Sequence, residues 1–307
     1  MKPDSKPLGL WVWISYGFLV ACLGMYLYMG SQPGGANAIW VYRFGRYFLA
    51  IGALLFLPIA FFCAWRSQPM ITRPRGLAFA CLAGTVGIAT WPVPYSTPHP
   101  PSTVEFRMPV AGAWRVLIGG RGDQANPLRL IPARCTGLQL VRDVEGAPIR
   151  EGAAVPPTYV DHLAFGEPVS SPCAGTVVRA VGDLPDLPAP DRRRSAEIGN
   201  HVVLEVGEGE YLYLANLQAG SLQVGVGERV KTGQSVARVG ASSRANPSSA
   251  PHLEVFLASH PDLQHAEGVP WFLFDYVADG VPIRSGVPRG GVARGGAWVG
   301  QVIEASR

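Results

Sequence analysis

The chain has 307 residues, of which 48% are apolar and only 16% are charged, whereas soluble proteins carry about 25% charged residues. This composition excludes a chain that is disordered throughout and argues against an ordinary soluble enzyme. The length allows roughly two domains. With 37 Gly and 28 Pro, turns are frequent, which favours β structure over a helical bundle.

The charge is divided unevenly along the chain. Residues 1–93 hold seven Lys and Arg against a single Asp, whereas the rest of the chain holds 19 basic and 21 acidic residues. The basic excess flanks apolar segments and does not form the basic face of a folded domain that nucleic-acid binding requires. The pattern therefore predicts a membrane protein and excludes nucleic acid as a partner.

Three uncharged apolar segments predict a membrane domain over residues 1–93. The first, residues 8–29, would form a helix about 33 Å long, enough to cross the hydrocarbon core of a bilayer. Residues 47–65 form a second run, and residues 76–91 form a third, weaker run. We therefore expect about three transmembrane helices.

Basic residues at the ends of these segments predict the orientation. Lys2 and Lys6 precede the first segment, and three arginines lie between the second and the third. With three spans both groups fall on one side, which the positive-inside rule makes cytoplasmic, although Arg43 and Arg46 lie on the other side. The C-terminal two thirds are then extracytoplasmic. A cleaved signal peptide ending at residues 36–38 is the alternative, and it leaves the C-terminal part on the same side.

The sequence of the extracytoplasmic part predicts a linker followed by a β domain. Residues 94–104 are rich in proline, which is typical of an extended linker. From residue 105 to residue 283, runs rich in Val, Leu and Tyr alternate with Gly- and Pro-containing turns, which predicts an all-β domain. The expected strands cover residues 113–118, 138–141, 175–181, 201–206, 211–217, 235–239 and 252–257. Residues 284–307 form a Gly-rich tail, in which residues 297–303 could add a strand.

Cys135 and Cys173 could form a disulfide outside the cytoplasm.

Six motifs between residues 165 and 257 occur in the order found in the lysostaphin/LytM-type zinc endopeptidases, which cleave peptidoglycan peptides. They are Phe165-Gly-Glu-Pro-Val169, Ser171-Pro-Cys-Ala-Gly-Thr-Val177, Gly199-Asn-His-Val202, Leu214-Ala-Asn-Leu217, Gly227-Glu-Arg-Val-Lys-Thr-Gly-Gln234 and Pro251-His-Leu-Glu-Val-Phe256. The segment resembles that family, with weaker similarity over residues 108–277 as a whole. The resemblance implies a LytM-like, duplicated-hybrid-motif β barrel or sandwich, and a place at the bacterial cell envelope, anchored in the cytoplasmic (inner) membrane with the β domain in the periplasm.

The resemblance also implies a catalytic zinc ion with two His ligands and one Asp ligand, which activates a water molecule. This sequence departs from that pattern. His252 matches the first His of the family's H-x-H motif, whose two residues project from one face of a strand. Glu254 stands where the second, zinc-binding His is expected. Asn216 replaces a further His that assists catalysis in the family.

The remaining two zinc ligands depend on the alignment register. In the preferred register Gln139 stands at the ligand Asp and Leu128 lies near the ligand His. In the other register Asp161 keeps the carboxylate, but Pro157 occupies the His position. Neither register places a His at this zinc-ligand position. If a metal were bound, Asp161, His252 and Glu254 would be its ligands.

We therefore expect a membrane-anchored pseudoenzyme that keeps the fold without zinc or another cofactor. Its partner would be a cell-wall hydrolase, another envelope protein or peptidoglycan, held in a groove lined by Gln139, Asn216, His252 and Glu254, with His252 as a relic base. Two alternatives stay open. One is an active zinc metalloendopeptidase with non-standard ligands. The other is a lipoyl-like envelope adaptor, because residues 224–240 resemble lipoyl-domain hairpins.

Overall fold

In the computed structural model the chain divides into a helical unit, Met1–Pro98, and a β unit, His99–Arg307. The structure describes residues 9–31, 34–67, 69–91, 93–120, 126–142, 149, 151, 158–188, 196–244, 250–289 and 300–306. Lys2, Lys6, Pro157, the start of the first predicted span and the first part of the predicted strand 297–303 lie outside these described residues.

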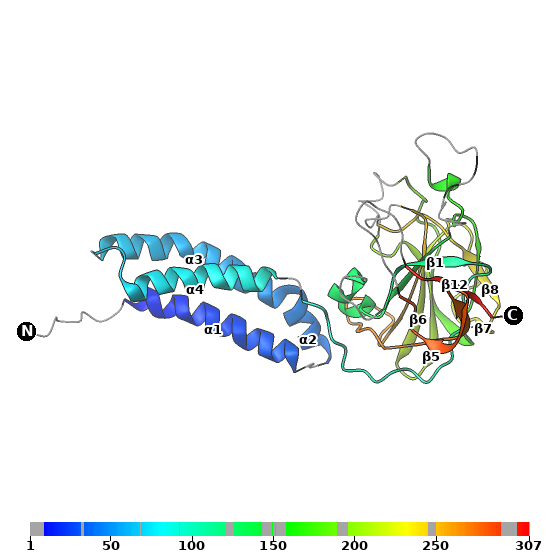
Figure 1. The fold of residues 1–307 in the computed structure, drawn as a ribbon, viewed down its shortest axis with the longest axis horizontal. Helices are drawn as coiled ribbons and strands as arrows, with labels where there is room; N and C mark the ends of the chain where they lie inside the picture. Colours follow the sequence, from blue (N-terminus) through cyan, green and yellow to red (C-terminus); the bar gives the residue numbers. More distant parts are fainter. Residues whose placement is uncertain are drawn as a thin grey trace, which may run out of the picture. The chain divides into compact units, whose positions relative to one another are not determined.

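The helical unit contains three long helices that pack side by side (Figure 1). α1 is Leu10–Gly30; α2 (Ala36–Trp40) continues through a π-helical turn, η1 (Val41–Gly45), into α3 (Arg46–Arg66); and α4 is Arg73–Thr90. Within the described residues, two helices are long and apolar enough to cross a membrane, namely Leu10–Gly30 and the continuous helix Ala36–Arg66.

The expectation of about three spans is supported in part, because two of the three predicted segments lie in helices of this kind. The third predicted segment does form a helix, α4, but α4 has only 18 residues and a lower mean hydropathy than α1 or α3. Its first turn contains Arg73 and Arg75 on either side of Pro74, a residue suited to the first turn of a helix. Two of its 18 residues are therefore charged, which lowers its apolar character.

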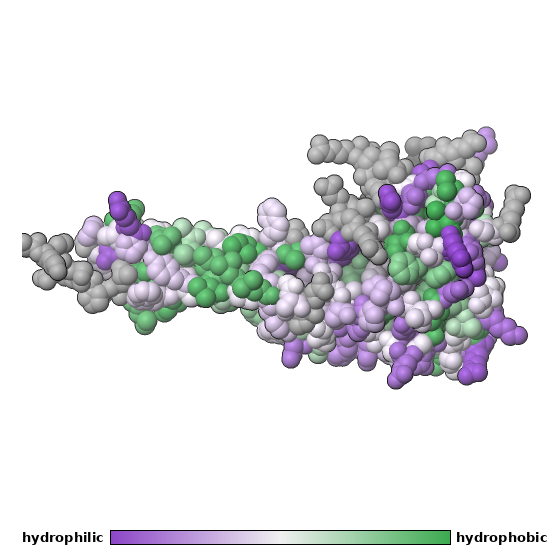
Figure 2. Space-filling model, turned by 60° about the horizontal axis from the view of Figure 1, so that its bottom comes forward, coloured by the Kyte–Doolittle hydropathy of each residue, from purple (hydrophilic) through white to green (hydrophobic). Residues whose placement is uncertain are grey.

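Small side chains allow the three long helices to approach one another closely. Ala53, Ala60, Ala64 and Ala78 are all fully buried between them, together with Leu82. Large apolar side chains point outward instead. Figure 2 shows hydrophobic residues gathered along the middle of the helices, whereas the most hydrophilic residues lie mainly over the β unit. An apolar exterior around a core of small residues is typical of helices packed in a membrane.

The β unit contains twelve strands within the described residues. In chain order they are β1 (Trp114–Ile118), β2 (Leu138–Val141), β3 (Pro168–Ser170), β4 (Gly175–Val181), β5 (Asn200–Gly207), β6 (Glu210–Leu217), β7 (Arg229–Val230), β8 (Ser235–Arg238), β9 (Leu253–Ala258), β10 (Leu273–Ala278), β11 (Val281–Gly286) and β12 (Val302–Ala305). Ten form one sheet in the order β11-β10-β12-β1-β2-β9-β6-β5-β4-β7, and β3 pairs with β8 in a second sheet. All these strand pairs are antiparallel. Three short 3-10 helices, η2 (Pro127–Leu130), η3 (Pro132–Arg134) and η4 (Tyr159–Asp161), lie between strands.

The large sheet is covered on both faces, because successive side chains of a strand point to opposite sides. On one face, Leu214 of β6 and Val255 of β9 join the main core, to which Val169 of β3 also belongs. On the other face, Tyr213 and Phe256 stack with their ring centroids 4.5 Å apart. That second face carries the candidate site.

The seven expected strands are confirmed, each within one or two residues of its predicted ends. The expected β character of this part is therefore correct, and its form is a large, mostly antiparallel sheet with a small second sheet. β3, β7, β10 and β11 were not predicted. β3 and β7 are very short, and β11 contains Pro282, whereas β10 has six residues and no proline.

Residues 99–110, which we call the strap, run along the β unit, although residues up to 104 were expected to belong to a linker. Backbone hydrogen bonds join Ser102 N to Pro270 O (2.8 Å) and Phe274 N to Phe106 O (2.8 Å). The Phe106 side chain is fully buried, and its ring meets that of Trp271 edge-on at 5.4 Å. The strap is thus part of the core of the β unit.

Candidate functional site

The centre of the candidate site is a pair of side chains on neighbouring strands. Gln139 of β2 lies directly opposite Glu254 of β9. Both residues are 1% exposed, and the Gln139 Nε2 donates a hydrogen bond to Glu254 Oε2 at 3.0 Å. They share the second face of the sheet, because the flanking residues of β9 point into the main core.

An arginine from η3 completes this pair. Arg134 Nε donates to Glu254 Oε1 and Arg134 Nη2 donates to Glu254 Oε2, each at 2.6 Å. The Arg134 side chain is 8% exposed and that of Glu254 is 1% exposed, so this bidentate ion pair is buried. Paired charge-assisted hydrogen bonds of this geometry are among the strongest polar contacts in proteins.

Glu197, which precedes β5, extends the cluster toward the surface. Arg134 Nη1 donates to Glu197 Oε1 at 3.1 Å, and the Glu197 side chain is 45% exposed. We call Arg134, Gln139, Glu197 and Glu254 the Arg134 network. Burial acts to lower the pKa of Arg134, but the carboxylates of Glu254 and Glu197 outweigh it, so the pKa is raised and the guanidinium stays charged.

Gln139 and Glu254 were predicted from the sequence, whereas Arg134 was not. Its partner Glu254 is 120 residues away along the chain, and Arg134 lies outside the six motifs. No local pattern therefore marked it, and only the folded sheet brings the two together.

Asn216 forms a second polar cluster at the end of β6. It is fully buried and has a left-handed backbone, with φ of 63°. It sits at an irregularity in the β5–β6 pairing, where Leu217 pairs with Asn200 and Ala215 pairs with His201. Asn is one of the few residues other than Gly that adopt this conformation readily.

Both polar atoms of the Asn216 side chain form hydrogen bonds to the backbone of neighbouring loops. Its Nδ2 donates to His252 O at 2.7 Å and to Gly240 O at 3.1 Å, and its Oδ1 accepts from Ser243 N at 2.9 Å. These bonds hold the end of β6 to the loop that leads into β9. Asn216 therefore has a structural role, because it stabilises the connection between β6 and β9.

His252 is also held by the backbone. It is 1% exposed, and its Nδ1 lies 2.9 Å from Ala250 O. A carbonyl oxygen only accepts, so this contact requires the proton on Nδ1. Asn216 Nδ2 lies 3.4 Å from the same nitrogen. The ring is thus fixed beside Asn216.

The four residues expected to line a groove lie beneath the surface. Asn216 is 0% exposed, and Gln139, His252 and Glu254 are each 1% exposed. Segments before β2 and β5 pack on this face, since Ala133 and Ile198 join the hydrophobic cluster around Tyr213 and Phe256. The chain itself therefore covers the face that was expected to meet a partner.

Asp161 belongs to a different local structure. It closes η4 in a capping box, in which its carboxylate accepts from Thr158 N at 2.7 Å and from Thr158 Oγ1 at 2.8 Å. Among the residues that the structure describes, no group of three or more His, Cys, Asp or Glu side chains is placed to hold a metal ion. Asp161, His252 and Glu254 are thus not gathered into a ligand set.

Cys135 and Cys173 are free cysteines in the structure, so the disulfide considered from the sequence is not formed. Both are buried. Burial raises the pKa of each thiol to about 12. The two side chains therefore behave as small apolar residues.

Comparisons with known proteins identify part of the β unit. Residues 160–262 match the sequence profile of peptidase family M23. No curated protein matches the chain. Solved structures with similarity include a family M23 peptidase from Pseudomonas aeruginosa (18% identity, 56% of this chain and 51% of that chain, TM-score 0.30) and a zinc-containing peptidase from Vibrio cholerae (20%, 54% and 39%, TM-score 0.33). The catalytic domain of lysostaphin from Staphylococcus simulans is similar at 18% identity over 43% of this chain and 73% of that chain, with a TM-score of 0.27.

The chain spans about half the length of the Pseudomonas aeruginosa structure. The profile match runs from η4 to just beyond β9 and so includes Asn216, His252 and Glu254, whereas Arg134 and Gln139 precede it. The similarity to peptidase family M23 therefore covers about a third of the chain, all of it within the β unit.

Proposed function

We propose that this chain is a membrane-anchored M23-like module that binds or regulates a partner at the cell envelope and does not hydrolyse peptides. The proposal rests mainly on the hydrogen bonds that the Glu254 carboxylate already accepts within the protein. Both of its oxygens are bound by Arg134, and one is also bound by Gln139. The position that the family resemblance assigns to a zinc ligand is thus engaged with an internal cation.

The donor set does not fit a zinc ion. A zinc site needs three protein ligands with lone pairs directed at one point. Here the Arg134 guanidinium donates to both oxygens of the buried Glu254 carboxylate at 2.6 Å. A dication beside Arg134 would be strongly repelled in this buried setting. Gln139 presents its donor nitrogen to Glu254. We therefore derive no catalytic step through a metal.

The assignment of a base is also unsupported by the geometry. Asn216 stands where the family has an assisting His, and an amide does not accept a proton at neutral pH. His252 has its Nδ1 engaged with Ala250 O and is 1% exposed. Such a module would act through its surface, with a cell-wall hydrolase, another envelope protein or peptidoglycan as the partner.

The two long apolar helices support anchoring in the bacterial inner membrane. With the β unit on the periplasmic side, the module would face the cell wall. This placement requires α4 to cross the membrane as a third span, so that Lys2, Lys6 and the arginines at the α3–α4 connection all lie on the cytoplasmic side. It suits the peptidoglycan-directed chemistry that the family resemblance implies.

The experiment is a joint measurement of metal content and hydrolysis on the full-length protein in detergent. The protein is soaked in zinc and dialysed, its zinc is measured by elemental analysis, and purified peptidoglycan is assayed for released peptides. We expect well below one zinc per chain and no release. About one zinc per chain, together with peptide release that His252→Ala abolishes, would overturn the proposal.

A further inference from the structure

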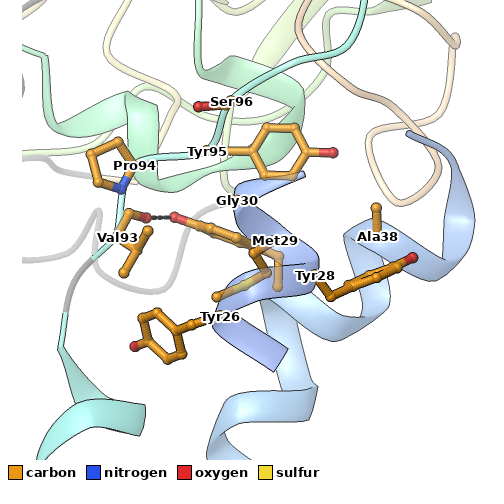
Figure 3. Close-up of a pocket in the computed structure, with 10 residues that line it drawn as sticks. Tyr26, Tyr28, Met29, Gly30, Ala38, Val93, Pro94, Tyr95 and Ser96 are labelled. Carbon is orange, nitrogen blue, oxygen red and sulfur yellow. Dashed lines mark hydrogen bonds between the residues drawn. The ribbon is translucent and has the colours of Figure 1, made fainter. Parts of the chain in front are cut away.

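A cavity of about 130 Å³ lies at one end of the helical unit. The last turns of α1, together with α2, η1 and residues 93–96, surround it (Figure 3). Four tyrosines line it, Tyr26, Tyr28, Tyr42 and Tyr95, and Ala38 lies on the side formed by α2. Its volume accommodates a group of several non-hydrogen atoms.

The tyrosines tie together the chain segments that form the cavity. Tyr26 Oη donates to Ile88 O at 2.5 Å, and Tyr42 Oη donates to Val93 O, the bond drawn in Figure 3. The rings of Tyr42 and Tyr95 meet edge-on with centroids 5.1 Å apart. The walls of the cavity are therefore held in place by hydrogen bonds and ring contacts.

A buried cation lies directly behind this wall. Arg46, the first residue of α3, is 6% exposed, and its guanidinium lies 5.0 Å from the Tyr42 ring centroid and 4.9 Å from that of Tyr47. Nη1 donates to Trp91 O at 3.1 Å, but Nε has no hydrogen-bond partner among the described residues. A buried charge is expensive unless it is paired.

No acidic residue is available nearby in the sequence to pair with Arg46. No Asp or Glu occurs between Asp4 and Glu105, so the described part of the helical unit contains no carboxylate side chain. A cationic ligand in the tyrosine cavity would meet an uncompensated positive charge. An anionic ligand would supply the missing partner.

The local backbone provides an independent indication of a site. η1 is a π-helical turn inside an otherwise continuous helix, and it places Tyr42 at the cavity and Arg46 immediately after it. Such turns are rare and are frequent at functional sites. Tyr and Trp side chains gather at this same end of the helices, as they do where helices leave a bilayer.

We propose that this cavity binds the headgroup region of an anionic phospholipid, with the glycerol region against the tyrosines and the phosphate close enough to Arg46, across the Tyr42 ring, to compensate its charge. The proposal rests on the membrane anchoring proposed above. It assigns the cavity a ligand whose charge complements Arg46 and whose polar and apolar parts suit a lining of tyrosines.

The test is native mass spectrometry of the full-length protein released from vesicles that contain equal amounts of phosphatidylglycerol and phosphatidylethanolamine. Flotation with the vesicles is measured first, so that failed membrane anchoring is distinguished from a failed lipid site. We expect about one phosphatidylglycerol retained per chain, in preference to phosphatidylethanolamine. Arg46→Gln, and Ala38→Leu, which fills the cavity without changing charge, should each lower this retention about tenfold. Arg46→Lys should retain part of it.

Arg66→Gln is the matched control. Arg66 is the last residue of α3 and also lies over an aromatic ring, that of Phe62 at 5.6 Å, but at the opposite end of the helix. This variant should bind lipid like the wild type. Equal retention of the two lipids, full displacement of phosphatidylglycerol by inorganic phosphate, or equal losses in Arg46→Gln and Arg66→Gln would each overturn the proposal, provided that the proteins float with the vesicles.

Discussion

Replacing Arg134 by Met should strongly destabilise the β unit. The substitution removes two hydrogen bonds of 2.6 Å from the Glu254 carboxylate, whose side chain is 1% exposed, and leaves only the 3.0 Å bond from Gln139. Removing one partner of a buried ion pair typically costs about 3–5 kcal/mol, because the remaining charge is left in a low-dielectric site. Domains are stable by about 5–15 kcal/mol, so we expect the variant to fold with a much smaller margin.

Hydrogen–deuterium exchange of the full-length protein in detergent measures this effect within the β unit alone. Amides of β2 and β9 that exchange only through global unfolding should exchange about 10²- to 10³-fold faster, or somewhat more, in Arg134→Met, since each 1.36 kcal/mol corresponds to a factor of ten. Peptides from α1 and α3 should be unchanged and serve as an internal reference.

Two further variants make the test specific. Arg134→Met/Glu254→Gln removes the unpaired charge and should recover most of the lost protection, because replacing both members of a buried pair is often nearly neutral. Arg107→Met breaks an ion pair with Asp275 whose side chains are 42% and 48% exposed, and should cost less than about 1 kcal/mol. The reasoning is refuted if Arg134→Met changes exchange no more than Arg107→Met does. If Arg134→Met alone does not fold, a folded double variant supports the reasoning and an unfolded one refutes it.

Three other expectations follow from the described geometry. Asn216→Ala should be less stable than Asn216→Gly by about 1 kcal/mol, because both lose the side-chain bonds but only Ala is strained at positive φ; equal stabilities in urea titrations would contradict this. Burial lowers the pKa of His201, so its neutral form is favoured in the folded state. Stability from this group is present above the unfolded pKa of about 6.5 and is lost as the pH falls through the lower folded value; His201→Gln should flatten this part of a stability–pH curve, and an unchanged curve would contradict it. Cys135 and Cys173, buried with pKa values of about 12, should resist alkylation at pH 8 until the β unit unfolds, and rapid labelling in the absence of denaturant would contradict this.

Local sequence patterns predicted the elements whose signal is contained within a few residues. The short apolar runs 138–141 and 175–181, each bounded by turn residues, predicted β2 and β4 with their observed ends. β7 has two residues, too few for any periodicity, and Pro282 within β11 reads as a turn residue because it donates no ladder hydrogen bond. The third predicted span was uncharged only from residue 76 onward, whereas the helix itself begins at Arg73.

The candidate site was predictable only where it coincided with a motif. Glu254 and His252 occupy an identifiable H-x-H position, and Asn216 lies in a recognisable strand. The left-handed backbone of Asn216 belongs to an irregularity in the β5–β6 pairing. The burial of the predicted groove residues depends on chain segments that fold over this face, among them those of Ala133 and Ile198. Arg134 depends on a contact across 120 positions, which no window of sequence contains.

The strap has a mechanical consequence. Its backbone bonds to Pro270, Pro172, Ser170 and Phe274 are distributed along its length and reach several separate segments of the β unit. A pulling force applied at His99 would be shared among these bonds and the buried ring of Phe106, and extraction of that ring would expose the main core. The β unit is thus expected to yield under load in one cooperative step, with little gradual peeling, so that a tether ending here transmits force to the sheet.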